Sequence, residues 1–334
     1  MSSLDLFAIG NTIIDQEFQV SDVFLAEQNL QKGTMQLTDG DTQTALYQRL
    51  TESQIYKGQA SGGSAANTTV AFAALGGRAF YGCRVGEGEA GQFYINGLND
   101  VGIRTAEQSF CEGVTGTCMV LITPDTERTM HTYLGTTADL SINEIDYVAL
   151  AHAKWLYIEG YLSTSDSARH AVLKARTIAK QNKIQVALSL SDPAMVQYAR
   201  AGLTEMLAEG VDLLFCNEQE ALMFTQQNQL DDAVAALLEC NTTVVVTLGV
   251  KGALVATQNE KIYVKGRKVQ AVDTNGAGDA FAGAFLYAIQ RGFDVEQAAE
   301  LAVLISSEVV AQFGPRLPIE KYAKLLQTME VDLA

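Results

Sequence analysis

Short apolar runs alternate with helical patterns along most of this 334-residue chain, and this alternation constrains the fold more than any other feature. Each apolar run has the length of a buried strand, with a helical pattern following or nearby. The pattern predicts one helix over residues 64–75, with Ser64 as its N-cap, and another over 91–101. We therefore expect an α/β fold, a mostly parallel sheet with helices on both faces. The predicted strands are residues 4–9, 79–85, 154–158, 184–190, 212–216 and 243–248.

Two regions, residues 15–56 and 108–138, interrupt this alternation and are richer in Thr and Gln. The second contains an alternating segment at 117–123, which is typical of a strand exposed on one face. We interpret the two regions together as a small β-sheet lid. The segments 1–14, 57–107 and 139–334 then form one large α/β domain.

Charge and composition exclude several classes of function. The net charge of −16 argues against a nucleic-acid partner, which requires a basic face, although a small anion remains a suitable ligand. The longest uncharged run, residues 58–77, is too rich in Gly, Ser, Asn and Thr to span a membrane. Five scattered cysteines without C-x-x-C spacing, and an N-terminus without a secretory pattern, lead us to expect a cytoplasmic protein.

Two familiar nucleotide-binding motifs do not fit this chain. The segment GEGEAG, residues 86–91, matches G-x-G-x-x-G, but it lies far from the first strand. Its two glutamates would also repel a pyrophosphate, so we interpret it as a Gly-rich helix start. A Walker-type phosphate loop is excluded because the sequence has no Gly-Lys dipeptide.

Polar residues suited to sugar hydroxyls follow the first strand and precede the first predicted helix. Asn11 and Asp15 come directly after the strand, where a parallel sheet binds its ligands. In GGSAAN, Gly62 and Gly63 would let the backbone approach a ligand, and Asn67 offers both a donor and an acceptor. The alternative, a simple turn with a helix cap, is equally consistent with this segment alone.

Two later motifs also have both a structural and a functional interpretation. Asn217 and Glu220 share one face at a helix start, where they form either an ordinary cap or a contact to the water shell of Mg²⁺. The segment TLGVKGA, with Thr247, Gly249 and Gly252, forms either a hairpin turn or a flat slot for a purine base.

The segment DTNGAGDAF, residues 273–281, combines a flexible turn, a helix start and an acid. The N–H groups of Gly276, Ala277 and Gly278 are expected to point at one spot, where the helix dipole favours an anion. Asp279 in the first turn has two possible roles. It would either compensate the helix dipole or take the proton from an alcohol that attacks a phosphoryl group. A carboxylate and an anion hole in one place make sense together if the reaction is phosphoryl transfer to a hydroxyl.

In this order the motifs resemble the ribokinase-like (PfkB) family of carbohydrate and nucleoside kinases, from residue 10 to residue 318. GGSAAN with the downstream ALGG is similar to the family's N-terminal signature, DTNGAGDAF to its C-terminal signature and NEQE to its N-x-x-E element. The resemblance implies a Rossmann-like α/β sandwich with a β lid. It also implies ATP and Mg²⁺ as cofactors, and leaves room for a monovalent cation.

Within the family the chain looks most like the adenosine kinase branch, through residues 113–118, 127–135, 157–162 and 313–318. That likeness implies a ribonucleoside acceptor, with inosine, guanosine or a plain sugar such as ribose or fructose as alternatives; a non-catalytic ligand sensor is the competing class. It leaves the oligomeric state, monomer or dimer, open. The lid residues Met35, Leu37, Cys118 and Leu134 would either contact a nucleobase or pack the lid itself. The implied roles are Asp279 as base, Gly276, Ala277 and Gly278 as anion hole, Asn11, Asp15, Gly62, Gly63 and Asn67 for the sugar, Asn217, Thr247, Gly249 and Gly252 for ATP, Arg128 over the phosphates and Glu220 for magnesium.

Overall fold

The computed structural model describes residues 4–125, 127–240 and 242–332, and its main feature is a nine-stranded sheet. The sheet has the order β16-β15-β14-β13-β12-β11-β1-β5-β7. Its strands are parallel from β7 to β14, whereas β15 pairs antiparallel with both β14 and β16. This confirms the expected α/β class. The strands are β1 (Leu4–Ile9), β5 (Ala79–Gly82), β7 (Arg104–Thr105), β11 (Ala153–Glu159), β12 (Gln185–Ser189), β13 (Leu213–Asn217), β14 (Thr243–Thr247), β15 (Gly252–Ala256) and β16 (Lys261–Lys265).

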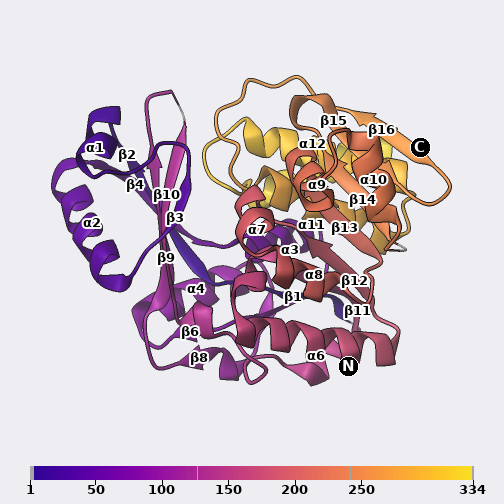
Figure 1. Ribbon diagram of the computed structural model, residues 1–334, viewed down its shortest axis with the longest axis horizontal. Coiled ribbons are helices and arrows are strands. Elements are labelled where there is room, and N and C mark those ends of the chain that lie inside the picture. The colour runs from indigo at the N-terminus through magenta and orange to yellow at the C-terminus, as the bar shows by residue number, and fades with distance from the viewer. Residues whose placement is uncertain (1–3, 126, 241, 333–334) are drawn as a thin grey trace.

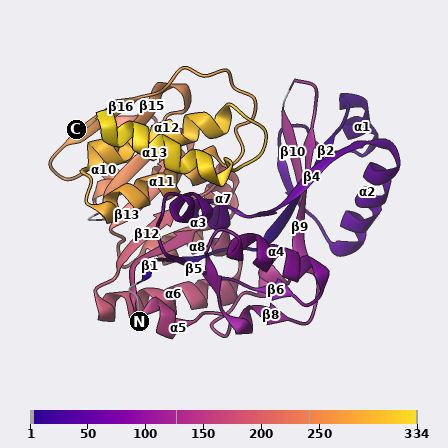
Figure 2. The same cartoon turned by 180° about the vertical axis from the view of Figure 1, so that it is seen from behind.

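Helices cover both faces of this sheet, as Figures 1 and 2 show from opposite sides. Successive strand residues point to opposite faces, so Tyr157 packs into one core while Leu156 and Ile158 pack into the other. The first core contains α3 (Ser64–Ala74), α4 (Glu89–Asn99), α11 (Ala277–Arg291), α12 (Val295–Val310) and α13 (Ile319–Asp332). The second contains α5 (Tyr147–Leu150), α6 (Asp166–Asn182), α7 (Pro193–Tyr198), α8 (Arg200–Leu207), α9 (Glu218–Thr225) and α10 (Leu230–Leu238).

A second sheet, which we call the lid, stands beside the large sheet (Figure 1). Two helices, α1 (Asp22–Glu27) and α2 (Gly40–Ser53), belong to it. Its five strands are β3 (Met35–Leu37), β10 (Arg128–Gly135), β9 (Thr115–Ile122), β2 (Ile13–Gln19) and β4 (Ile55–Gly62), in that order. The remaining elements are the strand pair β6 (Val85–Gly86) and β8 (Phe110–Cys111) and the 3₁₀ turns η1 (Glu107–Ser109), η2 (Thr136–Asp139), η3 (Gly160–Thr164) and η4 (Gly249–Lys251).

The lid differs from its prediction in two respects. The prediction that the 117–123 strand is exposed on one face is wrong, because both faces of β9 are covered. Met119 and Leu121 pack into a core with residues of α1 and α2, and Cys118 and Val120 pack on the other face. The predicted boundaries after residues 14 and 56 fall inside β2 and β4, which continue toward the large domain.

Of three further local predictions, two are corrected and one is confirmed. The N-cap of α3 is Gly63, so Ser64 is the first helical residue and its hydroxyl is free to serve elsewhere. The single strand predicted over 79–85 is interrupted, since β5 ends at Gly82 and β6 begins at Val85. The helix-start interpretation of GEGEAG is confirmed, because α4 begins directly after Gly88.

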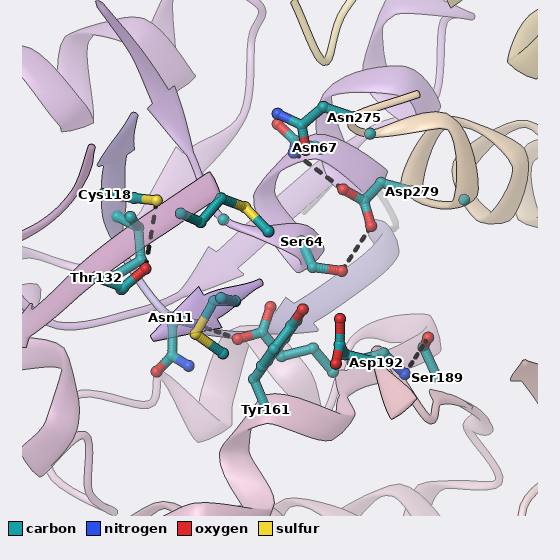
Figure 3. Close-up of a pocket in the computed structure, with 18 of the residues that line it drawn as sticks. Asn11, Ser64, Asn67, Cys118, Thr132, Tyr161, Ser189, Asp192, Asn275 and Asp279 are labelled. Atoms are coloured by element: carbon teal, nitrogen blue, oxygen red, sulfur yellow. Dashed lines mark hydrogen bonds between the residues drawn. The ribbon is translucent and has the colours of Figure 1, made fainter. Parts of the chain in front are cut away.

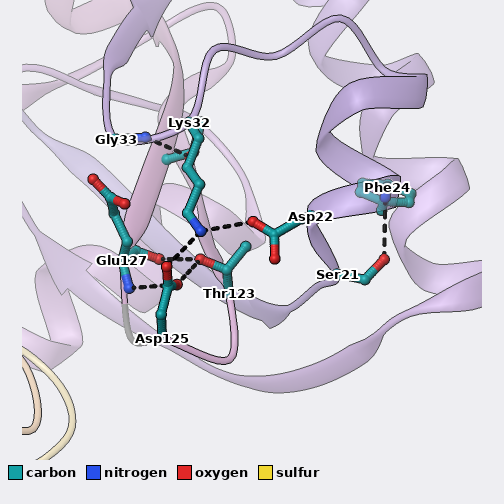
Figure 4. A network of polar contacts seen from close by, with 9 residues as sticks. Ser21, Asp22, Phe24, Lys32, Gly33, Thr123, Asp125 and Glu127 are labelled. Atoms are coloured by element: carbon teal, nitrogen blue, oxygen red, sulfur yellow. Dashed lines mark hydrogen bonds and ion pairs between the residues drawn. The ribbon is translucent and has the colours of Figure 1, made fainter.

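A polar network fixes the β9–β10 hairpin of the lid (Figure 4). Lys32 forms ion pairs of 2.6 Å with both Asp22 at the start of α1 and Asp125 in the hairpin. The pKa of Asp125 is lowered to about 2, chiefly by its bond from Lys32. Asp125 also accepts a 2.6 Å bond from Thr123, so the turn that precedes Arg128 is held from two sides. Within the described residues, no helix is both long and apolar enough to cross a lipid bilayer.

Candidate active site

A cavity of about 610 Å³ lies between the lid and the carboxyl ends of the parallel strands. Residues that follow β1, β11, β12 and β13 line it from below, and lid residues line it from above. Figure 3 shows Asn11, Asn67 and Asp279 around the cavity, three residues that are far apart in the sequence. The structure therefore brings most of the predicted sugar-binding and catalytic residues into one space, whereas Gly62 and Ala277 do not line it.

Asp279 lies in the first turn of α11 and is half-buried at the edge of this cavity. Its two carboxylate oxygens accept separate bonds, 2.6 Å from the Ser64 hydroxyl and 3.0 Å from the Asn67 amide (Figure 3). Burial raises the pKa of Asp279, while the bonds from Ser64 and Asn67 partly lower it. The carboxylate is thus oriented by α3 and has a raised proton affinity, which suits a general base.

At the start of α11, the three residues predicted to form an anion hole differ in their backbone contacts. Gly276 has a φ of +71°, and a Cβ there would meet the Pro315 carbonyl oxygen at 2.4 Å, so only glycine fits. The Ala277 N–H donates to the Thr274 carbonyl at 3.3 Å and is therefore committed to the turn. The first bond of the helix runs from the Ala280 N–H to the Gly276 carbonyl, so the N–H groups of Gly278 and Asp279 precede the helical ladder.

The predicted sugar-binding residues meet where β2 leaves β1 and β4 enters α3. Asp15 is buried and lines the cavity, and burial raises its pKa to about 7. A Cβ on Gly62 would meet the Asp15 carboxylate at 2.2 Å. Gly63 has a φ of +96° and passes close to the Asn11 carbonyl. The two glycines are therefore needed for this crossing of chains, and of the pair only Gly63 lines the cavity.

Glu159, at the end of β11, is a site residue that sequence reasoning did not single out. It is fully buried and accepts bonds of 2.7 Å from the backbone N–H groups of Asn11 and Ala65. Burial raises its pKa to about 7. Glu159 joins the end of β1 to the first turn of α3 and so sets the spacing between these two segments.

Arg316, in the segment before α13, was also missed. Its Nε donates to the Asn67 Oδ1 at 2.8 Å, and its Nη2 donates to the Ser61 carbonyl. These contacts leave the Asn67 amide nitrogen facing Asp279. Arg316 lies in the FGPRLP segment, 249 residues from Asn67. No local pattern indicates such a distant contact, so only the family resemblance could have suggested Arg316.

The lid contributes an apolar wall to the same cavity. The residues of this wall are uncharged. They include all four lid residues that were proposed to contact a nucleobase. The wall consists of Ile13, Met35, Leu37, Cys118, Val120, Met130 and Leu134. The Cys118 thiol accepts a 3.3 Å bond from Thr132 (Figure 3).

At the other end of the cavity, NEQE forms a capping box at the start of α9. The Asn217 side chain accepts from the Glu220 N–H at 2.8 Å, and the Glu220 carboxylate accepts from the Asn217 N–H at 2.9 Å and its amide at 2.6 Å. The cap interpretation is therefore confirmed. Burial raises the pKa of Glu220 to about 7.

The TLGVKGA segment forms the antiparallel β14–β15 hairpin through η4. Thr247 lines the cavity, and Gly249 lines a neighbouring hollow that Asn217 and Thr247 share. Gly252 has a φ of +109°, and a Cβ there would meet the Val264 carbonyl at 2.0 Å. Its role in this structure is to allow that close strand contact, and it lines neither space.

Comparisons with known proteins agree with this fold and identify the family. Residues 37–322 match the family model described as "pfkB family carbohydrate kinase". The chain is 33% identical to the adenosine kinase of Sinorhizobium meliloti, with a TM-score of 0.90 over 98% of this chain and 99% of the other. It is 31% identical to a probable sugar kinase of Rhizobium etli, with a TM-score of 0.91 over 99% and 100%. It is also 27% identical to the adenosine kinase of Saccharomyces cerevisiae, over 95% of this chain and 97% of the relative.

Proposed function

Since this chain belongs to the pfkB family of carbohydrate kinases, we propose that it transfers the γ-phosphoryl group of ATP to the 5′-hydroxyl of a ribonucleoside, adenosine first. The observation that carries this proposal is the placement of Asp279 beside the start of α11, within one cavity that also has an apolar lid wall. A ligand-sensing protein has no need of an oriented carboxylate beside an anion site. Under this proposal the protein acts in the cytoplasm, where ATP is abundant.

In the proposed reaction, Asp279 accepts the hydroxyl proton as the acceptor oxygen bonds to the γ-phosphorus. The bond from that phosphorus to the β,γ-bridging oxygen breaks, and ADP leaves. Negative charge on the phosphoryl oxygens is stabilised by the α11 dipole and by the early N–H groups at Gly278 and Asp279. Ser64 and Asn67 keep the base in position during this step.

Magnesium would enter with the phosphates of ATP, whose charge it neutralises. Among the described residues, no group of three His, Cys, Asp or Glu side chains is placed to hold a metal ion. Glu220 has its carboxylate bonded to Asn217, so in this proposal it contacts the ion through water. Asp192, which caps α7 and lines the same cavity, is a second carboxylate within this space. A monovalent cation stays a prediction from the family resemblance.

The acceptor is proposed from two surfaces of different character. Asn11 and Asp15 offer polar atoms to the two hydroxyls of a ribose, and Asn67, whose amide is bonded to Asp279 and Arg316, lines the same cavity. The lid wall offers a nucleobase a place to be buried, which is favourable by about 25 cal/mol for each Å² of apolar surface. A free sugar would use the first surface alone, so a sugar kinase is the second candidate, supported by the likeness to the R. etli protein.

Steady-state kinetics with a panel of acceptors tests this proposal. ADP release should be measured under one set of conditions with adenosine, inosine, 2′-deoxyadenosine, ribose and fructose. We expect adenosine to have the highest kcat/KM and free ribose a much lower one. The deoxynucleoside should also suffer, since a buried acceptor that loses its partner costs roughly 1–3 kcal/mol. If ribose or fructose leads, the sugar-kinase candidate replaces the nucleoside kinase.

A further inference from the structure

Arg316 lies between α12 and α13, and its guanidinium holds the end of β4 and the first turn of α3 together. Its Nε donates to the Asn67 Oδ1 at 2.8 Å, its Nη1 to the Ser61 hydroxyl at 3.2 Å and its Nη2 to the Ser61 carbonyl. Asn67 lines the cavity, whereas Arg316 does not. Arg316 therefore stands behind the site, where it can act on a bound ligand only through other residues.

The amide of Asn67 connects Arg316 to the carboxylate of Asp279. A guanidinium can only donate hydrogen bonds, so Arg316 binds the Asn67 oxygen, and the amide nitrogen is left to donate to Asp279 at 3.0 Å. A reversed amide would place its oxygen against a carboxylate and its NH₂ group against a guanidinium, and neither pair can form a hydrogen bond. Arg316 thus selects the one amide orientation that holds the Asp279 carboxylate.

The charge of Arg316 has a second consequence, because none of the ion pairs formed by the described residues includes this arginine. Burial raises the pKa of both Asp15 and Asp279. The positive charge of Arg316 lowers both pKa values, in Asp279 together with the bonds from Ser64 and Asn67. A buried cation is unfavourable unless anions compensate it, and these two carboxylates explain why an arginine occupies this place.

We propose that Arg316 is a positioning residue for the transfer step: it orients the Asp279 carboxylate through Asn67, and its charge balances the two carboxylates, Asp15 and Asp279, that line the cavity. This inference rests on the proposed function, because the orientation of Asp279 matters only if Asp279 takes a proton. An anchor for residues 313–318 would need neither the charge nor the contact with Asn67, since the bonds to Ser61 already attach this segment to β4.

The pH dependence of kcat separates this role from simple anchoring. In Arg316→Met we expect kcat at saturating adenosine to fall by roughly 10- to 100-fold, because a misplacement of about 1 Å can cost that much. The pH at which kcat is half-maximal should also move upward, since Asp279 without the nearby cation keeps its proton to higher pH. The other titratable groups that face Asp279 are unchanged in this variant; they are Asp15, Tyr157, Glu159 and Tyr161.

Arg176→Met is the matched control for the loss of a buried arginine. Arg176 lies in α6 and donates to the backbone carbonyls of Met206 and Gly210, away from the cavity. Its loss should lower the melting temperature and leave both kcat and the pH profile in place. A shift of the profile in Arg176→Met equal to that in Arg316→Met would show that the shift reports stability, and would overturn the inference.

A cycle of variants tests whether Arg316 acts through Asn67. It is measured on the high-pH plateau of kcat, where Asp279 is ionised with or without the cation, so that only orientation contributes. Arg316→Met should lower kcat strongly in the wild-type background and much less in protein that already carries Asn67→Ala, because residues acting as one unit have non-additive effects. Equal fold-losses in the two backgrounds would overturn the inference.

Arg316→Lys covers the case in which Arg316→Met folds poorly. The ammonium keeps the charge but lacks the planar fork that contacts Ser61 and Asn67 together. We expect its pH profile to stay in place while kcat falls in part. Wild-type kcat in Arg316→Lys, or an upward shift of its profile, would overturn the inference. Either result would leave the wild-type kinase activity standing, whereas failure of the proposed function would show as no phosphorylation of any acceptor by the wild-type protein.

Discussion

The carboxylates of the cavity have different partners, and those partners suggest different roles. Asp279 accepts from two side chains of α3 and faces the start of α11. Glu159 accepts only from backbone N–H groups, so it acts on the architecture of the site. Asp15 is crowded by Gly62 and lines the cavity, where acceptor hydroxyls would replace the water it has lost.

Asp279→Asn tests whether Asp279 is the general base, because it changes a single atom of the carboxylate. Asparagine keeps the shape and can still accept the Ser64 bond, but it cannot take a proton. We expect kcat to fall by roughly 10²–10⁴, the usual effect of losing a general base, and the acceptor KM to change little. Single-turnover measurements with a thermal melt as control would check this. A variant with unchanged kcat would mean that Asp279 is not the base.

Asp15 should control acceptor binding and its dependence on pH. Burial raises its pKa to about 7, so the ionised form that accepts two hydroxyl bonds is lost as the pH falls below that value. We expect the acceptor KM to rise as the pH falls from 8 to 6, while the ATP KM stays nearly constant. Asp15→Asn should raise the acceptor KM and remove this pH dependence. Weakened ATP binding with normal acceptor binding would refute the assignment.

At the scale of elements, the start of α11 depends on two glycines for different reasons. A Cβ on Gly276 would collide with Pro315, whereas a Cβ on Gly278 meets nothing within 4 Å and projects into open space beside the cavity. Gly276 is therefore needed for folding of the turn, and Gly278 would leave room for the phosphates of the proposed ATP complex.

The matched pair Gly276→Ala and Gly278→Ala makes this distinction measurable. We expect Gly276→Ala to lower the melting temperature, because its φ of +71° is strained for alanine. Gly278→Ala should leave the melting temperature unchanged or slightly raised, since alanine favours a helix by up to about 1 kcal/mol over glycine. Its kcat should nevertheless fall. Equal effects of both variants on stability would contradict the account.

The strands show how much of the fold the sequence could predict. Strands such as β1, β12 and β14 were placed to within about a residue because uninterrupted apolar runs report burial on both faces. The lid strand β9 was misjudged because α1 and α2, which cover it, come from a distant segment. Glu159 and Arg316 were missed for a similar reason: their partners lie 148 and 249 residues away, and no local pattern encodes such pairs.

For the whole molecule, the buried carboxylates predict an unusual dependence of stability on pH. Burial raises the pKa of Asp15, Glu159 and Glu220 to about 7 in the folded protein. The folded state thus binds more protons than the unfolded state between about pH 4.5 and pH 7, and the free energy of unfolding falls as the pH rises through that window. The net charge of −16 acts in the same direction, because its self-repulsion also weakens as the pH falls.

Calorimetry of the protein without ligands should therefore give a higher melting temperature at pH 6 than at pH 8. Glu220→Gln removes one of the three groups and should reduce that difference, while glutamine can still complete the capping box. A melting temperature that is lower at pH 6 than at pH 8 would show that these carboxylates are ionised at little cost in the folded state.

The central claim is that one cavity positions a nucleoside 5′-hydroxyl against ATP, and a competition experiment tests it most directly. The wild-type protein would be given ATP, Mg²⁺ and equal concentrations of adenosine, ribose and fructose in one tube, and the products followed by ³¹P NMR. Coupling to the two C5′ protons splits a 5′-phosphate resonance into a triplet. We predict that a triplet from adenosine 5′-monophosphate appears first and that Asp279→Asn suppresses it. Sugar phosphates forming ahead of the nucleotide, or a doublet from phosphate on a secondary hydroxyl of the nucleoside, would contradict the account.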